Sequence, residues 1–341
     1  MKKQENFMGL ISGFIIMKAN PFHQGHEALI DYAKDNCDKL FILVAALPGE
    51  PIPYKYRLQW VLSTYLDDPK IEVFGDIINN QPSDLLSGEK SVWWGDYIRH
   101  KYGKFDKVFS SEPYGKMFGK ILGAENWVFN EARTIVPISA TMIREKPLSN
   151  WNFLNNFAKD YFAKKIAIIG TETTGKTTLC KQLAKHYNTV WAPEAGDALV
   201  QHTKDTDVET IKLIGVEHAK NIRRFTRKAN KILFIDTDIN ITKSYAKFMC
   251  NEEVEFEPWI ERANEMDLYI YLNADAPYIQ DGRRLEPAGR RQLDRSHRGQ
   301  FKRSGIKFKE FPYSKNKGES GGYDWRFEQI IKHINLFLSK Y

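Results

Sequence analysis

Cysteine is scarce in this 341-residue sequence. There are three, Cys37, Cys180 and Cys250, and no two of them form a Cys-x-x-Cys pair. A cysteine-based zinc site therefore finds no support. A sparse and odd cysteine count is typical of proteins from a reducing compartment.

The sequence also lacks an apolar run long enough to span a membrane. Lysines and an apolar stretch near the N-terminus resemble the start of a signal peptide. That stretch ends at Lys18 without a small-residue cleavage pattern and is too short to cross a bilayer. We interpret it as a buried first strand and expect a cytoplasmic protein with no membrane partner.

No block of like charge forms a binding tail, although the formal net charge is +7. This surplus suits small polyanions such as nucleotides as well as nucleic acid. A cluster of arginines is interrupted by acidic residues, and we interpret most of it as a solvated helix face. The cluster comprises Arg283, Arg284, Arg290, Arg291, Arg295 and Arg298.

Two β-to-α openings organise the chain. The first joins an apolar strand at 13–17 to a helical pattern through KANPFHQGH, and the second starts at 164–170 and continues through TETTGKTT. Further runs that are apolar throughout predict buried parallel strands. We predict an α/β protein of two tandem domains, 1–158 and 159–341, each with a doubly wound parallel sheet. The further strands are expected at 39–47, 106–112, 231–238 and 267–273, and a helical connector at 147–165.

Residues 170–177 read GTETTGKT, a complete P-loop pattern between a strand and a helix. Its glycines let successive backbone N–H groups point at phosphates, and the following helix directs its positive end at them. Lys176 is expected to reach the β- and γ-phosphates, and the Thr177 hydroxyl to ligate Mg²⁺. The pattern predicts ATP as phosphoryl donor. The nucleotide-binding residues expected here are Gly170, Thr173, Thr174, Gly175, Thr177 and Thr178.

Carboxylates suited to a kinase follow the apolar strands. Asp236 ends one such strand and is the expected second Mg²⁺ ligand. Asp238 should point the same way along the strand. One of the two aspartates could hold the metal through water while the other accepts the proton of the substrate hydroxyl, and which does which stays open. Alternatively, Asp238 caps the next helix. Glu194 follows a short strand, where it either faces the acceptor or is an ordinary loop carboxylate. Arg284 either neutralises the transferring phosphate or is solvated.

The first opening carries Pro-Phe-His23-Gln-Gly-His26, which resembles the HxGH signature of nucleotidylyl transferases. In that family the two imidazoles contact the phosphates of ATP. The chemistry requires positive or donor groups around phosphorus and little acid–base work. Lys18 adds charge, and Gly13 is assigned to the same ATP site.

A second element, ISATMIR at 138–144, resembles the ISSTxxR signature of the same superfamily. Ser139 and Thr141 are expected to donate at a helix start, and Arg144 to hold the β- and γ-phosphates. Trp93 and Trp94 either pack in the core or present one indole to a cationic ring such as nicotinamide.

Taken in order, these segments resemble the NadR-type bifunctional enzymes over residues 8–340. The resemblance implies a Rossmann-like nicotinamide-nucleotide adenylyltransferase domain followed by a P-loop ribosylnicotinamide kinase domain. It also favours Trp94 for the nicotinamide stack and Arg284 for the kinase lid. PEAGDAL (193–199) replaces the usual WEYGREY, although Glu194 and Gly196 are kept. The matching segments include MKANPFHQGH, VFSSEPYG, ISATMIREKP, WAPEAGDALV, FIDTD and DGRR.

The resemblance predicts an enzyme that makes nicotinamide mononucleotide from ribosylnicotinamide with ATP and Mg²⁺, then NAD and pyrophosphate from that product and ATP. The family's helix-turn-helix domain is not seen before residue 8, so no DNA partner is predicted. The sequence leaves open whether the chain forms a homo-oligomer. Two alternatives remain: a related fusion that acts on another substrate, and an NAD-sensing regulator with one vestigial activity.

Overall fold

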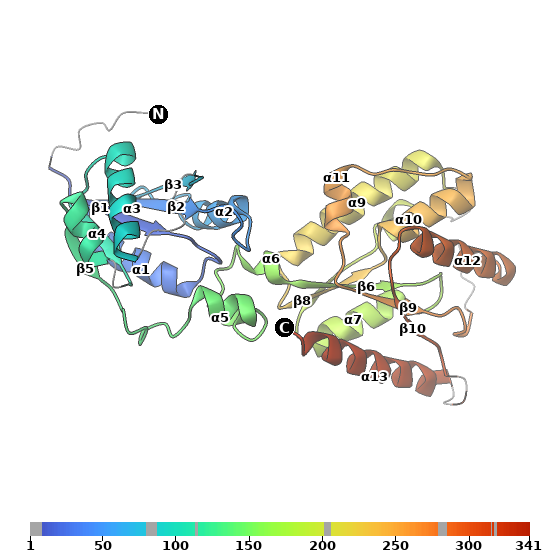
Figure 1. Ribbon diagram of the computed structural model, residues 1–341. Helices are drawn as coiled ribbons and strands as arrows, with labels where there is room; N and C mark the ends of the chain where they lie inside the picture. The colour runs from blue at the N-terminus through green and yellow to red at the C-terminus, as the bar shows by residue number, and fades with distance from the viewer. Residues whose placement is uncertain are drawn as a thin grey trace. The chain divides into compact units, whose positions relative to one another are not determined.

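In a computed structural model, the chain divides into two compact units, Met1–Lys159 and Asp160–Tyr341 (Figure 1). The structure describes residues 9–79, 87–112, 115–200, 206–278, 285–314, 316 and 319–341. Each unit is an α/β body built around its own sheet, and each is described by itself below.

The first unit contains a five-stranded sheet in the order β3-β2-β1-β4-β5, and every pairing is parallel. The order reverses between β1 and β4. In open parallel sheets, ligands bind at the carboxyl ends of the strands near such a reversal. The strands are β1 (Ser12–Met17), β2 (Lys39–Ala46), β3 (Ile71–Ile77), β4 (Lys107–Ser110) and β5 (Glu125–Val128).

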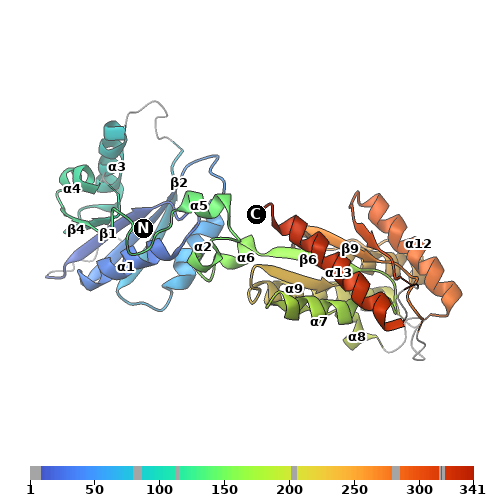
Figure 2. The ribbon, with the colours of Figure 1, turned by 90° about the horizontal axis from the view of Figure 1, so that it is seen from below.

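Helices cover both faces of this sheet (Figure 2). On one face, Phe14 and Leu43 pack against Ile98 of α3 and Phe118 of α4. On the other, α1 and α2 contact the central strands. Burial on both faces explains why β1 and β2 are apolar throughout. The helices are α1 (Gln24–Asp35), α2 (Tyr54–Thr64), α3 (Ser87–Tyr102), α4 (Gly115–Leu122) and α5 (Ala140–Glu145).

The second unit contains a parallel sheet in the order β10-β9-β6-β8-β7. Its central strand β6 precedes the P-loop, so the loop opens at the middle of the sheet edge. The neighbouring strand β8 ends in Asp236 at the same edge. The strands are β6 (Lys164–Ile169), β7 (Val190–Ala192), β8 (Ile232–Asp236), β9 (Leu268–Leu272) and β10 (Lys309–Phe311).

Side chains of β6 alternate between two cores. Ile166 and Ile168 pack with α7 and α13, whereas Ala167 and Ile169 pack with α10 and α12. Figure 1 shows the same division, with α7 and α13 on one side of the sheet. The elements are α6 (Lys159–Phe162), α7 (Lys176–His186), α8 (Gly196–Leu199), α9 (Val208–Thr226), α10 (Ile239–Tyr245), a π-turn (Ala246–Cys250), α11 (Pro258–Ala263), α12 (Pro287–Arg303) and α13 (Glu319–Leu338).

The connector, which the sequence predicts to be helical, is helical only in part. Its described helical parts are a short turn at Trp151–Phe153 and the four-residue α6. Between them, Leu154 forms a bridge with His23, and Asn155 donates from its backbone to Phe22. Asparagines recur in this stretch and favour turns over helix interiors. The connector therefore packs on the loop that carries the first histidine motif.

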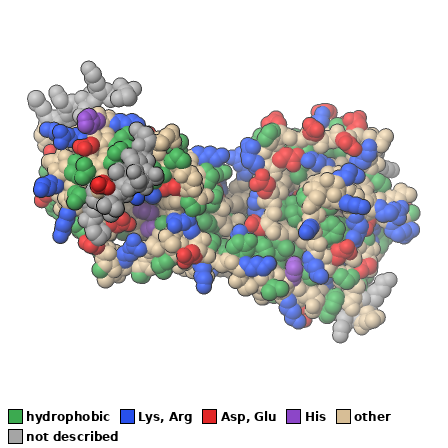
Figure 3. Space-filling view, viewed as in Figure 1, with side chains coloured by type: hydrophobic (Ala, Val, Ile, Leu, Met, Phe, Trp, Pro, Cys, Tyr) green, Lys and Arg blue, Asp and Glu red, His purple; other side chains and the backbone are tan. Residues whose placement is uncertain are grey.

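Basic and acidic side chains are interspersed over both units on the face seen in Figure 3. The surplus of positive charge does not gather into one stripe on that face. Among the residues that the structure describes, no helix has the length and apolar character needed to cross a membrane.

Candidate active sites

The loop after β6 has backbone conformations suited to holding phosphates. Gly170 has a φ of +144° and Gly175 a φ of +88°. A Cβ at Gly170 would lie 2.5 Å from the carbonyl oxygen of Leu272 on β9. Both positions therefore favour glycine. Because α7 begins directly after Gly175, the backbone N–H groups of its first turn, which have no partner within the helix, lie at the end of the loop.

Side chains hold this loop closed. Thr174 Oγ1 and Lys176 Nζ donate to the carbonyl oxygen of Thr171, at 2.8 Å and 3.1 Å. Thr173 has a φ of +59°, which is rare for a β-branched residue, and its buried hydroxyl has no hydrogen-bond partner within the described structure. A phosphate in the loop would give Lys176 a charged acceptor in place of the carbonyl. Thr178 is exposed on α7.

The two residues predicted to ligate Mg²⁺ are in contact. In the sheet register, Asp236 lies opposite Ile168, two residues before Gly170. Thr177 Oγ1 donates to Asp236 Oδ2 at 2.6 Å, and the Asp236 side chain is fully buried. A hydroxyl and a carboxylate are hard oxygen ligands, which Mg²⁺ prefers. This pair therefore fits a magnesium ion next to the phosphates.

Asp238 does not point the same way as Asp236, so that part of the prediction is wrong. Thr237 has a φ of +75°, and this left-handed residue breaks the alternation of the strand. Asp238 instead caps α10, accepting from Ile241 N at 3.1 Å and Asn240 Nδ2 at 2.8 Å. Burial raises the pKa of Asp238 to about 6. Of the roles left open for Asp238, the structure shows the helix cap.

Glu194 lies at the same sheet edge, just after β7. Thr237 Oγ1 donates to Glu194 Oε2 at 3.3 Å, so Glu194 contacts the residue that follows Asp236. His218 of α9 supports this turn, with its Nε2 3.3 Å from the carbonyl oxygen of Thr237. A carboxylate here faces the edge at which parallel sheets bind substrates. Arg284 lies outside the described residues.

The last helix supplies a P-loop contact that sequence reasoning missed. Arg326 of α13 is 3% exposed, and its Nη2 donates to the carbonyl oxygen of Thr174 at 2.6 Å. This contact joins positions 152 residues apart. No spacing signals it, because it depends on where α13 returns against the sheet.

In the first unit, His23 and His26 begin α1 with a reciprocal cap. Nδ1 of His23 accepts from Gly25 N at 3.1 Å, and Nδ1 of His26 accepts from His23 N at 3.3 Å. The ring centres lie 3.9 Å apart. A neutral imidazole that accepts at Nδ1 carries its proton on Nε2. Each ring therefore keeps one N–H donor for a ligand.

Both imidazoles are neutral at pH 7. Burial, followed by the charge of Arg133, lowers the pKa of His23 to about 4. Burial, followed by the neighbouring His23 and by Arg133, lowers the pKa of His26 well below its usual value. The chemistry of this site was expected to need either positive groups or hydrogen-bond donors around phosphorus. The two neutral histidines are of the second kind. Arg133 lies between β5 and α5 in no recognisable motif, so sequence reasoning missed it.

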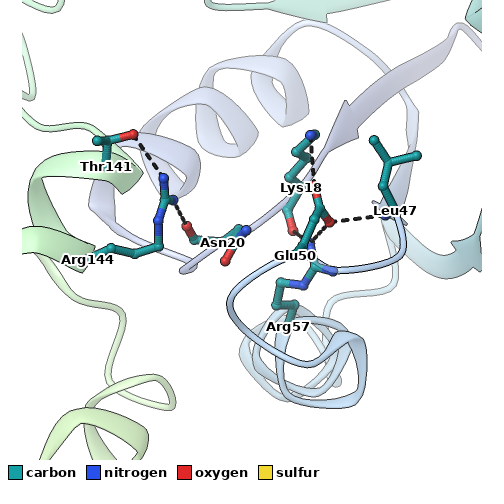
Figure 4. Close-up of polar contacts among 7 residues, drawn as sticks. All are labelled: Lys18, Asn20, Leu47, Glu50, Arg57, Thr141 and Arg144. Carbon is teal, nitrogen blue, oxygen red and sulfur yellow. Dashed lines mark hydrogen bonds and ion pairs between the residues drawn. The ribbon is translucent and has the colours of Figure 1, made fainter. Parts of the chain in front are cut away.

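Arg144 of the second motif contacts the loop that leads into the histidine motif (Figure 4). Arg144 Nη1 donates to the carbonyl oxygen of Asn20, and Nη2 donates to Thr141 Oγ1 at 3.0 Å. Ser139 caps the six-residue α5, accepting from Met142 N at 3.2 Å. The segment ISATMIR is therefore joined to the loop between β1 and His23.

Lys18, just after β1, belongs to an ion-pair network (Figure 4). Its Nζ lies 2.7 Å from Glu50 Oε1, and Glu50 Oε2 lies 2.7 Å from Arg57 Nη1. Arg57 is 1% exposed and also donates to the carbonyl oxygen of Lys18 at 3.1 Å. Glu50 offsets the charge of Lys18 and, with Arg57, fixes the strand end that leads to the histidines. Neither Glu50 nor Arg57 stood out in the sequence.

Two residues assigned to this site lie elsewhere or serve the core. Gly13 is at the opposite end of β1, about 13 Å before Met17 at strand spacing, so its assignment to the ATP site is wrong. A Cβ there would lie 2.7 Å from Cys37 Sγ, which explains the glycine by packing. Trp94 is half-buried on α3 and packs against the core. Its stacking on nicotinamide stays a prediction.

Comparisons with known proteins cover both units. Residues 165–319 match the family described as AAA domain, and residues 12–75 match the Citrate lyase ligase C-terminal domain. The Trifunctional NAD biosynthesis/regulator protein NadR of Escherichia coli (strain K12) is 28% identical over 305 residues, which are 83% of this chain and 72% of that protein.

Two solved structures are similar over almost the whole chain. A NadR protein in complex with NR has a TM-score of 0.78 at 20% identity, covering 96% of this chain and 97% of that one. A NadR protein in complex with NAD and AMP-PNP has a TM-score of 0.76 at 20% identity, covering 97% of both chains. At this identity the likeness shows a shared fold.

Proposed function

We propose that this chain, a homologue of the NadR proteins, joins two consecutive reactions of NAD salvage. The second unit phosphorylates ribosylnicotinamide with ATP to give nicotinamide mononucleotide. The first unit transfers the adenylyl group of a second ATP to that product, giving NAD and pyrophosphate. The product of one site is the substrate of the other, which gives a chemical reason for joining them in one chain.

The proposal is carried by two different sheet edges in one chain, each with groups suited to phosphates. The second unit pairs a P-loop with the Thr177–Asp236 contact of 2.6 Å. The first places two neutral imidazole donors at a helix start beside Arg144. The arrangement in the second unit suits transfer of the terminal phosphoryl group. The arrangement in the first unit suits attack at an internal phosphorus.

In the kinase reaction, the P-loop backbone and Lys176 hold the β- and γ-phosphates of ATP. Thr177 and Asp236 would hold magnesium, which would supply positive charge beside these phosphates. The acceptor hydroxyl attacks the γ-phosphorus, the bond to the β–γ bridging oxygen breaks, and ADP leaves. We assign Glu194 to the acceptor hydroxyl and its proton, because Thr237 holds this carboxylate beside Asp236 while Asp238 is committed to the cap.

In the adenylyl transfer, a phosphate oxygen of nicotinamide mononucleotide attacks the α-phosphorus of ATP, and pyrophosphate leaves. The nucleophile is already an anion, so no proton needs to move. His23 and His26 donate from Nε2 to phosphate oxygens. Arg144, with Arg133 as a charged neighbour, stabilises the charge that develops on the leaving group.

The proposal is tested by chromatography of products after the protein is incubated with ribosylnicotinamide, ATP and Mg²⁺. Accumulation of NAD is the expected result. Mononucleotide without NAD would assign activity to the second unit alone. If neither ribosylnicotinamide nor added nicotinamide mononucleotide leads to ATP consumption, the proposal is wrong and a related substrate or a regulatory role takes its place.

A further inference from the structure

A buried arginine in the second unit has guanidinium nitrogens that no described residue satisfies. Arg290 lies near the start of α12 and is 5% exposed. Its Nε and Nη2 are buried without a hydrogen-bond partner in the described structure. A donor removed from water without a hydrogen-bond partner is destabilising. An arginine kept in this state calls for a partner that arrives with a ligand.

Contacts at the start of α12 place Arg290 beside the P-loop. Leu285 N donates to Glu172 Oε2 of the P-loop at 3.1 Å, and Tyr278 Oη donates to Leu285 O at 2.8 Å. The Arg290 guanidinium lies 5.9 Å from the centre of the Tyr278 ring. Arg290 N donates to Glu286 O at 2.9 Å within the first turn. Arg290 is therefore about one helical turn from the point where this segment is joined to the P-loop.

Acidic side chains surround Arg290 without bonding its two buried nitrogens. Asp294, Asp275 and Glu172 interact with its charge. Asp294 accepts from Arg298 Nε at 2.8 Å and from Tyr271 Oη at 2.8 Å. Asp275 accepts from Tyr313 N at 3.0 Å, and Glu172 from Leu285 N. These carboxylates favour the charged form of the arginine, although burial lowers its pKa, and none of them accepts a hydrogen bond from Nε or Nη2.

We propose that Arg290 binds the terminal phosphates of the nucleotide held by the P-loop. Nε and Nη2 form one edge of the guanidinium, and their parallel N–H groups match two oxygens of a phosphate. Burial on a helix orients this edge before the nucleotide arrives, so little ordering is needed on binding. The inference rests on the proposed kinase function of the P-loop. It assigns a role to one arginine of a cluster that looked like a solvated helix face.

The test compares Arg290→Met with Arg291→Met, which removes an exposed arginine from the next position of the same helix. Affinity for a non-hydrolysable ATP analogue and for inorganic tripolyphosphate is measured on the full chain by the rise in unfolding temperature. All variants share the same first unit, so a difference between them reports on the second. Arg290→Met should weaken both ligands about 10- to 100-fold, as expected when charged hydrogen bonds are lost. Arg291→Met should change either by less than about twofold.

A purely structural role for Arg290 gives a different pattern. In that case Arg290→Met lowers the unfolding temperature of the unliganded protein and leaves ligand affinity unchanged, and the proposal is overturned. The proposal instead expects Arg290→Met to weaken both ligands, whatever the substitution does to the unfolding temperature of the unliganded protein.

A second variant covers the case in which Arg290→Met does not fold. Arg290→Lys keeps the charge but loses the parallel donors, and it should weaken tripolyphosphate about 3- to 10-fold. Unchanged affinity in this variant would also overturn the proposal. Kinase turnover is measured separately. Failure of the natural chain to phosphorylate ribosylnicotinamide contradicts the proposed function, whereas the binding measurements still decide the role of Arg290.

Discussion

The two candidate sites would hold phosphates by different means. In the second unit the ligand site is mostly backbone, and positive φ angles at Gly170 and Gly175 shape the loop before α7. In the first unit it consists mostly of side chains, with imidazole donors at His23 and His26. Both sites lie where strands end at a sheet edge and a helix begins. The edge of a parallel sheet can thus support two chemistries, because the loop after the strand determines which backbone and side-chain groups contact the ligand.

Charge is also distributed differently in the two sites. The P-loop has one ammonium, Lys176, that can leave the carbonyl of Thr171 for a phosphate. In the first unit Lys18 is paired with Glu50, and both histidines are neutral. In the proposed reactions, transfer at the γ-phosphorus would therefore rely on a cation and magnesium, whereas transfer at the α-phosphorus would rely on neutral donors and arginines. Substitutions in one site should leave the other working.

The largest effect is expected from Lys176→Ala. Removing the ammonium should lower the kinase rate by about 1,000-fold, because a donor to the transferring phosphate is lost. Adenylylation of supplied nicotinamide mononucleotide should be unchanged. The measurement is ADP formation with ribosylnicotinamide and, in parallel, NAD formation with the mononucleotide. Equal loss of both activities would mean that the sites are coupled or that the fold is damaged.

His26→Ala should have the opposite selectivity. It removes one imidazole donor and one half of the reciprocal cap on α1, so adenylylation should fall about 100- to 1,000-fold. Kinase turnover should stay within about twofold of the natural chain. His26→Asn is the matched variant, because it keeps a side-chain donor and should retain more activity than His26→Ala. Equal rates in the two variants would argue against hydrogen-bond donation.

The central strands and the P-loop were predictable because their signals are local. Strands β1, β2, β6 and β8 are buried on both faces and read as continuous apolar runs. The edge strands β3, β5 and β10 were not predicted from the sequence, because their half-exposed residues alternate with charged or polar ones. The P-loop was found because its chemistry comes from consecutive residues.

Long-range contacts were not predictable in the same way. Arg326 reaches the P-loop from the last helix, and Arg57 reaches the carbonyl oxygen of Lys18 just after β1, with no motif around either. The role of Asp238 depended on a single backbone angle at Thr237, which period-two alternation does not reveal. Such features depend on how distant segments pack or on unusual local strain.

Asp238→Asn should have a smaller effect than the first two substitutions. Asparagine is as good a helix cap as aspartate, so α10 should keep its start. The kinase rate should fall less than about tenfold, because the structure gives Asp238 a cap rather than the proton of the acceptor. Asp236→Asn is the matched control and should abolish magnesium-dependent turnover. A loss of more than 100-fold in Asp238→Asn would return the proton-accepting role to Asp238.

The smallest effect is expected from pH on the adenylylation rate between pH 7.0 and 8.5. The pKa of His23 is lowered to about 4 and that of His26 is also lowered, so both rings stay neutral across this range. Raising the pH removes no proton that the site needs, and kcat should change less than about twofold. If an imidazolium of ordinary pKa near 6.5 were required, kcat would instead fall about tenfold per pH unit. Measuring kcat at saturating ATP and mononucleotide decides between neutral donors and charged ones, and with it whether the two sites really differ in kind.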